Sequence, residues 1–135
     1  MQITDYYNDY QVKRNTCLSL NQFTSMLMMY PSILVAIADG EFDALEKQNL
    51  AESLKQAAES NTLIACEMYS ELSYLMKAND EVKEDLLINI KNEISNKADI
   101  KSLILELMTS MAESSEGISD IELKTISTLK NKLSI

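Results

Sequence analysis

Four carboxylates lie within eight residues of this chain, and they are the side chains best placed to do chemistry. Asp39, Glu41, Asp43 and Glu46 belong to residues 36–46, which read AIADGEFDALE. Carboxylate and carbonyl oxygens are the ligands that hard divalent cations prefer. Asp43 and Glu46 also stand at the spacing of a capping box, in which both side chains bind backbone N–H groups at the start of a helix. Two interpretations stay open: helix caps alone, or caps that also hold a cation weakly.

The same segment matches only the second half of an EF-hand loop. Gly40 would occupy the sixth position of that loop and Glu46 the twelfth. The first and third positions must supply acidic oxygens, but here they would be Val35 and Ile37. This mismatch excludes an EF-hand.

Composition removes several other kinds of chemistry. The chain has no His, which excludes an imidazole base, a Ser-His or Cys-His nucleophile and the common zinc sites. Cys17 and Cys66 lie far apart in the chain, and we predict both as small buried hydrophobic residues. Twelve basic residues against 21 acidic ones give a net charge of −9. No basic face for nucleic acid is expected, and binding to anionic lipid is disfavoured.

Apolar residues recur every fourth position, which is typical of amphipathic helices. Gly (2) and Pro (1) are too scarce to supply the tight turns of a β domain. We therefore predict an all-α fold, a compact bundle of six to seven helices. Their expected ranges are 20–38, 44–60, 62–78, 80–96, 99–113 and 120–133, and Pro31 should kink or split the first of them near Met29. Residues 1–18 are predicted as an N-terminal arm or short helix, and residues 19–135 as a single domain.

An internal repeat emerges when the sequence is shifted by 76 positions without a gap. Phe42 then falls on Ile118, and Leu45-Glu46 falls on Ile121-Glu122. Ser119 takes the place of Asp43 as the expected helix cap. We predict two related helical halves, with Phe42 and Ile118 as equivalent buried residues. Gly40 should lie at positive φ as the first residue past the end of its helix.

The motif AxADGxFDxxE at residues 36–46, placed after an apolar helix, resembles the TerB family of tellurite-resistance domains. The resemblance covers roughly residues 22–134, is specific at residues 36–46 and is schematic elsewhere. It implies an all-helical domain made of two related halves, each with an acidic turn and a helix-opening Glu. It also implies a non-enzymatic role in bacterial tellurite and stress resistance, and an acidic surface that binds a divalent metal.

Carried onto this chain, the resemblance implies Asp39, Asp43 and Glu46 as metal ligands, with calcium, magnesium or zinc as the candidate cation. The second turn departs from the family pattern, because Ser115 stands where an Asp is expected. Its weaker candidates are Glu116, Asp120 and Glu122.

We expect a cytoplasmic TerB-like stress module that binds a protein partner, with no nucleic-acid binding and no membrane insertion. No stretch has the length and apolar character of a signal peptide or a bilayer span. One alternative is an acidic inhibitor or mimic that occupies a basic surface by charge. A less favoured alternative is a metal-dependent carboxylate hydrolase, against which the absence of His counts. The sequence leaves the partner, the oligomeric state and the kind of stress undetermined.

Overall fold

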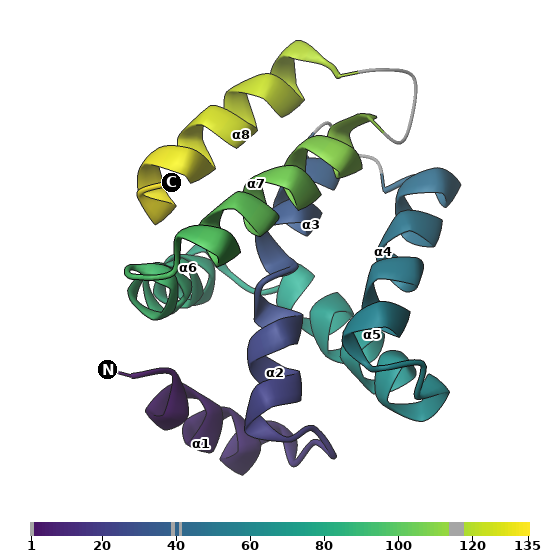
Figure 1. The fold of residues 1–135 in the computed structure, drawn as a ribbon, viewed down its shortest axis with the longest axis vertical. Helices are drawn as coiled ribbons and strands as arrows, with labels where there is room; N and C mark the ends of the chain where they lie inside the picture. The colour runs from purple at the N-terminus through teal and green to yellow at the C-terminus, as the bar shows by residue number, and fades with distance from the viewer. Residues whose placement is uncertain (1, 39, 41, 114–117) are drawn as a thin grey trace.

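The computed structural model describes residues 2–38, 40, 42–113 and 118–135. These residues form helices and contain no strand, so the predicted all-α class is confirmed (Figure 1). The helices are α1 (Ile3–Arg14), α2 (Leu20–Leu27), α3 (Tyr30–Ala36), α4 (Ala44–Ala57), α5 (Thr62–Met76), α6 (Asp80–Ile94), α7 (Ala98–Glu113) and α8 (Asp120–Leu133). Counting α2 and α3 as one interrupted helix, the described part of the chain has seven.

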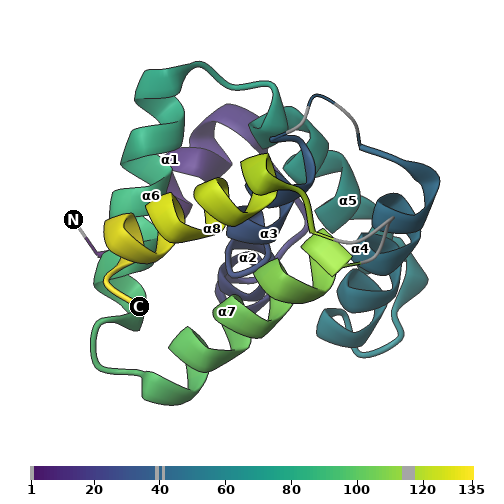
Figure 2. The ribbon, with the colours of Figure 1, turned by 90° about the horizontal axis from the view of Figure 1, so that it is seen from above.

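The break between α2 and α3 lies where Pro31 predicts it. Met28 and Met29 separate the two helices, and Pro31 stands in the first turn of α3, where its missing N–H is not needed. The Ser32 hydroxyl donates to the Met29 carbonyl oxygen over 2.6 Å inside the core. The short α3 is thereby redirected into the middle of the molecule, where α7 and α8 pack against it (Figure 2).

Small polar residues start most of the other helices, as the sequence indicates. Asp43, Asn61, Asn79 and Ser119 each accept a hydrogen bond from the backbone N–H three residues later. Such caps satisfy donors that the helix itself leaves unpaired. The helix predicted over 99–113 begins one residue earlier, at Ala98, so that Asp99 lies inside the first turn of α7.

Residues near the N-terminus form the helix α1. Of the two alternatives for residues 1–18, an arm or a short helix, the structure has the helix. Three tyrosines of α1 surround the fully buried ring of Phe23 on α2. The ring centroids of Tyr6, Tyr7 and Tyr10 lie 6.1, 5.3 and 5.0 Å from that of Phe23. The Tyr7 hydroxyl also donates to the Leu18 carbonyl oxygen over 2.6 Å. Aromatic packing therefore holds α1 against α2.

Both cysteines are exposed free thiols, so the prediction that they are buried was wrong. Cys17 lies in the connection between α1 and α2, where its backbone N–H donates to the Glu67 carboxylate over 3.3 Å. Cys66 lies on the outer side of α5. Neither position faces the core, because the apolar stripe of α5 follows Met68, Leu72 and Leu75 instead.

None of the described helices combines sufficient length with sufficient apolar character to cross a membrane.

Candidate functional site

The first acidic turn ends in a complete capping box at the start of α4. The Glu46 backbone N–H donates to Asp43 Oδ1 over 2.8 Å, and the Asp43 backbone N–H donates to Glu46 Oε1 over 3.0 Å. Glu46 is only 2% exposed. Asp43 and Glu46 therefore act as helix caps in the structure. Asp39 and Glu41 lie outside the described residues.

The second turn repeats this arrangement at the start of α8. Glu122 donates its backbone N–H to Ser119 Oγ, and Ser119 donates its own to Glu122 Oε1, both over 3.1 Å. Glu122 is buried, as Glu46 is, whereas Asp120 is exposed. Glu116 lies outside the described residues.

The equivalence of the two turns extends over eleven residues. Residues 42–52 and 118–128 alternate between exposed, half-buried and buried positions in the same order, at the predicted shift of 76. Within this stretch Leu45 and Ile121 correspond, and both are more than half exposed. Both helices start in the upper right part of Figure 1. The match supports a local repeat, while the relation between whole halves stays a prediction.

The side chains of Phe42 and Ile118 are less buried than predicted. They occupy equivalent places and both touch the core, but each is half-buried rather than buried. Each side chain lies just before a helix cap, at the edge where the core meets solvent. Removing the Phe42 ring should therefore cost less than the roughly 3–5 kcal/mol expected for a fully buried ring.

Gly40 has a φ of +89°, so its predicted left-handed conformation is confirmed. Its predicted place as the first residue past the helix was wrong. The helix α3 ends at Ala36 with Ile37 as its C-cap, and Gly40 follows in a separate turn. That turn is closed by the Gly40 N–H, which donates to the Ile37 carbonyl oxygen over 3.0 Å.

We predict that Gly40→Val lowers the free energy of unfolding by about 1–2 kcal/mol, because L residues avoid positive φ. A Cβ at this position would meet no atom within 4 Å, so the backbone conformation alone carries the effect. Urea denaturation measures it, and Gly40→Ala should show a milder loss of the same sign. An unchanged midpoint for both variants would contradict this account.

In the described part of the chain, no three Asp, Glu or Cys side chains gather closely enough to hold a metal ion. Asp39 and Glu116 lie outside that part of the chain. A cation site that depends on Asp39 therefore stays a prediction.

An ionic cluster around the buried Glu71 links α1 to α5, and the sequence analysis missed it. Arg14, the only arginine of the chain, donates from Nε to Glu71 Oε1 over 2.9 Å and from Nη2 to Glu71 Oε2 over 3.2 Å. The Tyr10 hydroxyl donates to Glu71 Oε1 over 2.6 Å. The Arg14 guanidinium also lies 4.0 Å from the centre of the Tyr74 ring. The one signal in the sequence that could have indicated this cluster is the position of Glu71, a charged residue next to the apolar stripe of its helix.

These bonds keep Glu71 ionised although it is only 5% exposed. Burial alone would raise the pKa of Glu71. The hydrogen bonds from Arg14 and Tyr10 outweigh burial and hold that pKa below its ordinary value of 4.5. Burial and the bond to Glu71 raise the pKa of Tyr10, which therefore remains a donor. Tyr10 and Arg14 of α1 thus both donate to Glu71 of α5, which ties the two helices together.

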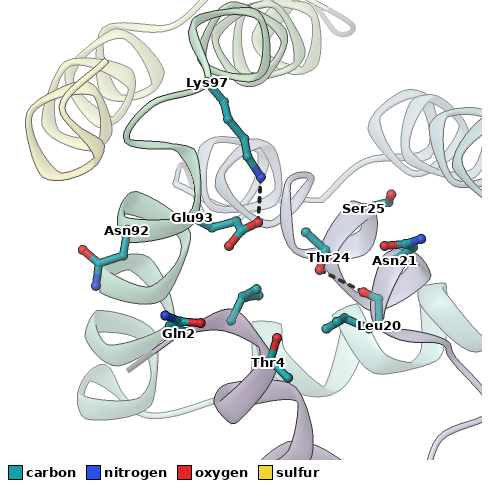
Figure 3. Close-up of a pocket in the computed structure, with 10 residues that line it drawn as sticks. Gln2, Thr4, Leu20, Asn21, Thr24, Ser25, Asn92, Glu93 and Lys97 are labelled. Carbon is teal, nitrogen blue, oxygen red and sulfur yellow. Dashed lines mark hydrogen bonds and ion pairs between the residues drawn. The ribbon is translucent and has the colours of Figure 1, made fainter.

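A hollow of about 650 Å³ lies where α1 and α2 begin and α6 ends (Figure 3). Amide and hydroxyl side chains line it, including Gln2, Thr24 and Asn92. Its two charged side chains neutralise each other, since Lys97 Nζ lies 2.8 Å from Glu93 Oε1. Thr24 donates its hydroxyl to the Leu20 carbonyl oxygen over 2.8 Å. The charged groups of the hollow are thus already paired with each other, and none is left to select a charged ligand.

Comparisons with protein-family models, with curated proteins and with solved structures found no match to this chain.

Proposed function

We propose that this protein is a non-enzymatic, TerB-like module that binds a protein partner through its two acidic turns, in a stress or tellurite-resistance setting. The observation that carries the proposal is the pair of equivalent turns, each with an exposed aliphatic residue two positions past the helix cap. Leu45 is 56% exposed and Ile121 is 53% exposed. Core packing does not require these side chains, while contact with a partner would bury them.

The surroundings of these residues favour a partner with basic groups. Asp120 adjoins Ile121, and Leu123 adds a third aliphatic side chain that is 51% exposed. An exposed aliphatic residue beside an exposed carboxylate, as at Ile121, suits a surface that combines apolar and basic side chains. The net charge of −9 acts in the same direction by steering such a partner from a distance.

The test for a partner uses affinity capture with the wild-type chain and with Leu45→Ser/Ile121→Ser. Val12→Ser/Leu63→Ser is the matched control, because its targets are 86% and 83% exposed and lie on other helices. A partner of the turns is retained by the wild type and by the control, but lost from the turn variant. The affinity for the purified partner then quantifies the loss. Equal retention by all three proteins would refute a role for the turns.

The proposal includes a weak divalent-cation site at the first turn, held by oxygen ligands from Asp39, Asp43 and Glu46. The support is the acid content of the turn, because carboxylates that cap a helix can keep oxygen lone pairs for a cation. Asp120 and Glu122, with Glu116, form the weaker second candidate.

We predict that Ca²⁺ or Mg²⁺ raises the melting temperature of the wild type and that Asp39→Asn abolishes this rise. Asp39 has no part in the capping box, so the variant removes a ligand and spares the cap. A second variant, Asp43→Ser, introduces the cap that Ser119 provides in the other turn and removes a carboxylate. It should retain the cap and lose the response to the cation. If neither ion stabilises the wild type, the acids act as helix caps only.

A further inference from the structure

Three lysines gather at one hollow between α3, α6 and α8, although the chain as a whole is strongly acidic. Lys83 comes from α6, and Lys124 and Lys132 come from α8, which lies along α3 and α6 in Figure 2. The volume of the hollow is about 420 Å³, within the roughly 300–1,000 Å³ typical of small-molecule sites. Two carboxylates share its rim, so the hollow carries a local excess of positive charge on a molecule of net charge −9.

The floor of this hollow is apolar. Leu87 and Leu129 are buried beneath it, and three half-buried residues near the end of α3 complete it. These are Leu34, Ile37 and Ala38. An apolar floor with charged groups at the rim is the usual arrangement for a ligand that has an apolar body and a polar head.

The hydrogen bonds and ion pairs around the hollow show which groups are available to a ligand. Lys132 pairs with Glu84, which joins α8 to α6. Lys83 and Lys124 form no ion pair with any residue that the structure describes. The hydroxyl groups of Thr125 and Thr128 already donate to backbone carbonyl oxygens, over 2.8 and 3.0 Å. The donors left for a ligand are therefore the ammonium groups of Lys83 and Lys124.

We propose that this hollow binds a small organic monoanion in which one carboxylate is attached to an apolar chain. The carboxylate would lie between the ammonium groups of Lys83 and Lys124, and the chain would cover the leucines of the floor. Asp80 stands at the same rim and limits the charge that the site accepts. The two lysines and this carboxylate together leave one positive charge, which a monoanion balances and a multiply charged anion would exceed.

The experiment measures the binding of octanoate to the full chain by isothermal titration calorimetry. Octanol tests the need for the charge, and inorganic phosphate tests the need for the apolar chain. The variant Lys83→Gln/Lys124→Gln removes the two available ammonium groups. The matched control is Lys91→Gln/Lys130→Gln, which takes the same charge from the same two helices at positions outside the hollow.

Saturable octanoate binding is expected for the wild type and the control, with binding about tenfold weaker in the hollow variant. Octanol and phosphate should each bind at least tenfold more weakly than octanoate. The proposal is overturned if octanoate shows no saturable binding, or if both double variants bind it equally. It is also overturned if octanol or phosphate binds as tightly as octanoate. Lys91 and Lys124 are exposed and Lys83 and Lys130 are half-buried, so the two double variants are matched in burial, and the melting temperature checks that both fold.

Discussion

Alanine in place of Phe23 should lower the free energy of unfolding by about 3–5 kcal/mol, the cost of removing a fully buried ring. Phe23 is 0% exposed, and the rings of Tyr6, Tyr7 and Tyr10 pack around it. The variant would leave a cavity between α1 and α2 and remove the main aromatic anchor of α1. Urea denaturation followed by far-ultraviolet circular dichroism measures the loss.

The matched control is Phe42→Ala, because Phe42 is the other phenylalanine of the chain and is half-buried. Phe42→Ala should lower the free energy of unfolding by less than about 2 kcal/mol, since folding removes only part of this ring from water. If Phe23→Ala fails to fold, Phe23→Leu provides a milder test with an expected loss under about 1.5 kcal/mol. Equal losses for the two alanine variants would contradict the packing described for α1.

Glu71→Gln should lower the free energy of unfolding by about 2–3 kcal/mol, because it leaves the Arg14 guanidinium without its charged partner. Breaking a fully buried ion pair typically costs about 3–5 kcal/mol. The Arg14 side chain is 33% exposed and can recover part of its hydration, which lowers the expected figure. Glu93→Gln is the control, since its pair with Lys97 lies near the surface and should contribute less than about 1 kcal/mol.

The double variant Arg14→Met/Glu71→Leu tests whether the loss comes from an unpaired charge. Removing both charged groups together should restore at least half of the stability lost in Glu71→Gln. A double variant as unstable as the single one would show that the cluster contributes through packing or through Tyr10 instead.

The contribution of Glu71 should also depend on pH in a defined direction. The pKa of Glu71 is lowered in the folded state, so the folded protein holds its proton less tightly than the unfolded chain does. The stabilisation is complete above the unfolded pKa, near 4.5, and is lost as the pH falls through the folded pKa. The difference in stability between wild type and Glu71→Gln should therefore shrink below about pH 4.5. A constant difference would mean that Glu71 does not titrate in this way.

Local patterns of the sequence determined the helices and most of their starts. The four-residue spacing of apolar side chains requires only that one face of each helix be buried, and the caps act within three residues. For that reason the helices from α4 to α8, the break near Pro31 and the capping boxes at Asp43 and Ser119 could be predicted. The same holds for the positive φ of Gly40, which depends on its own turn.

Only the tertiary structure decided which side chains meet across helices. Glu71 and Arg14 are 57 residues apart, and their pairing depends on how α1 packs on α5. Lys83 and Lys124 share a hollow because α6 and α8 pack side by side. The exposure of Cys17 and Cys66 and the half-burial of Phe42 were decided in the same way. Burial depends on the neighbours that a position acquires when helices pack, and helical periodicity carries no information about which helices those are.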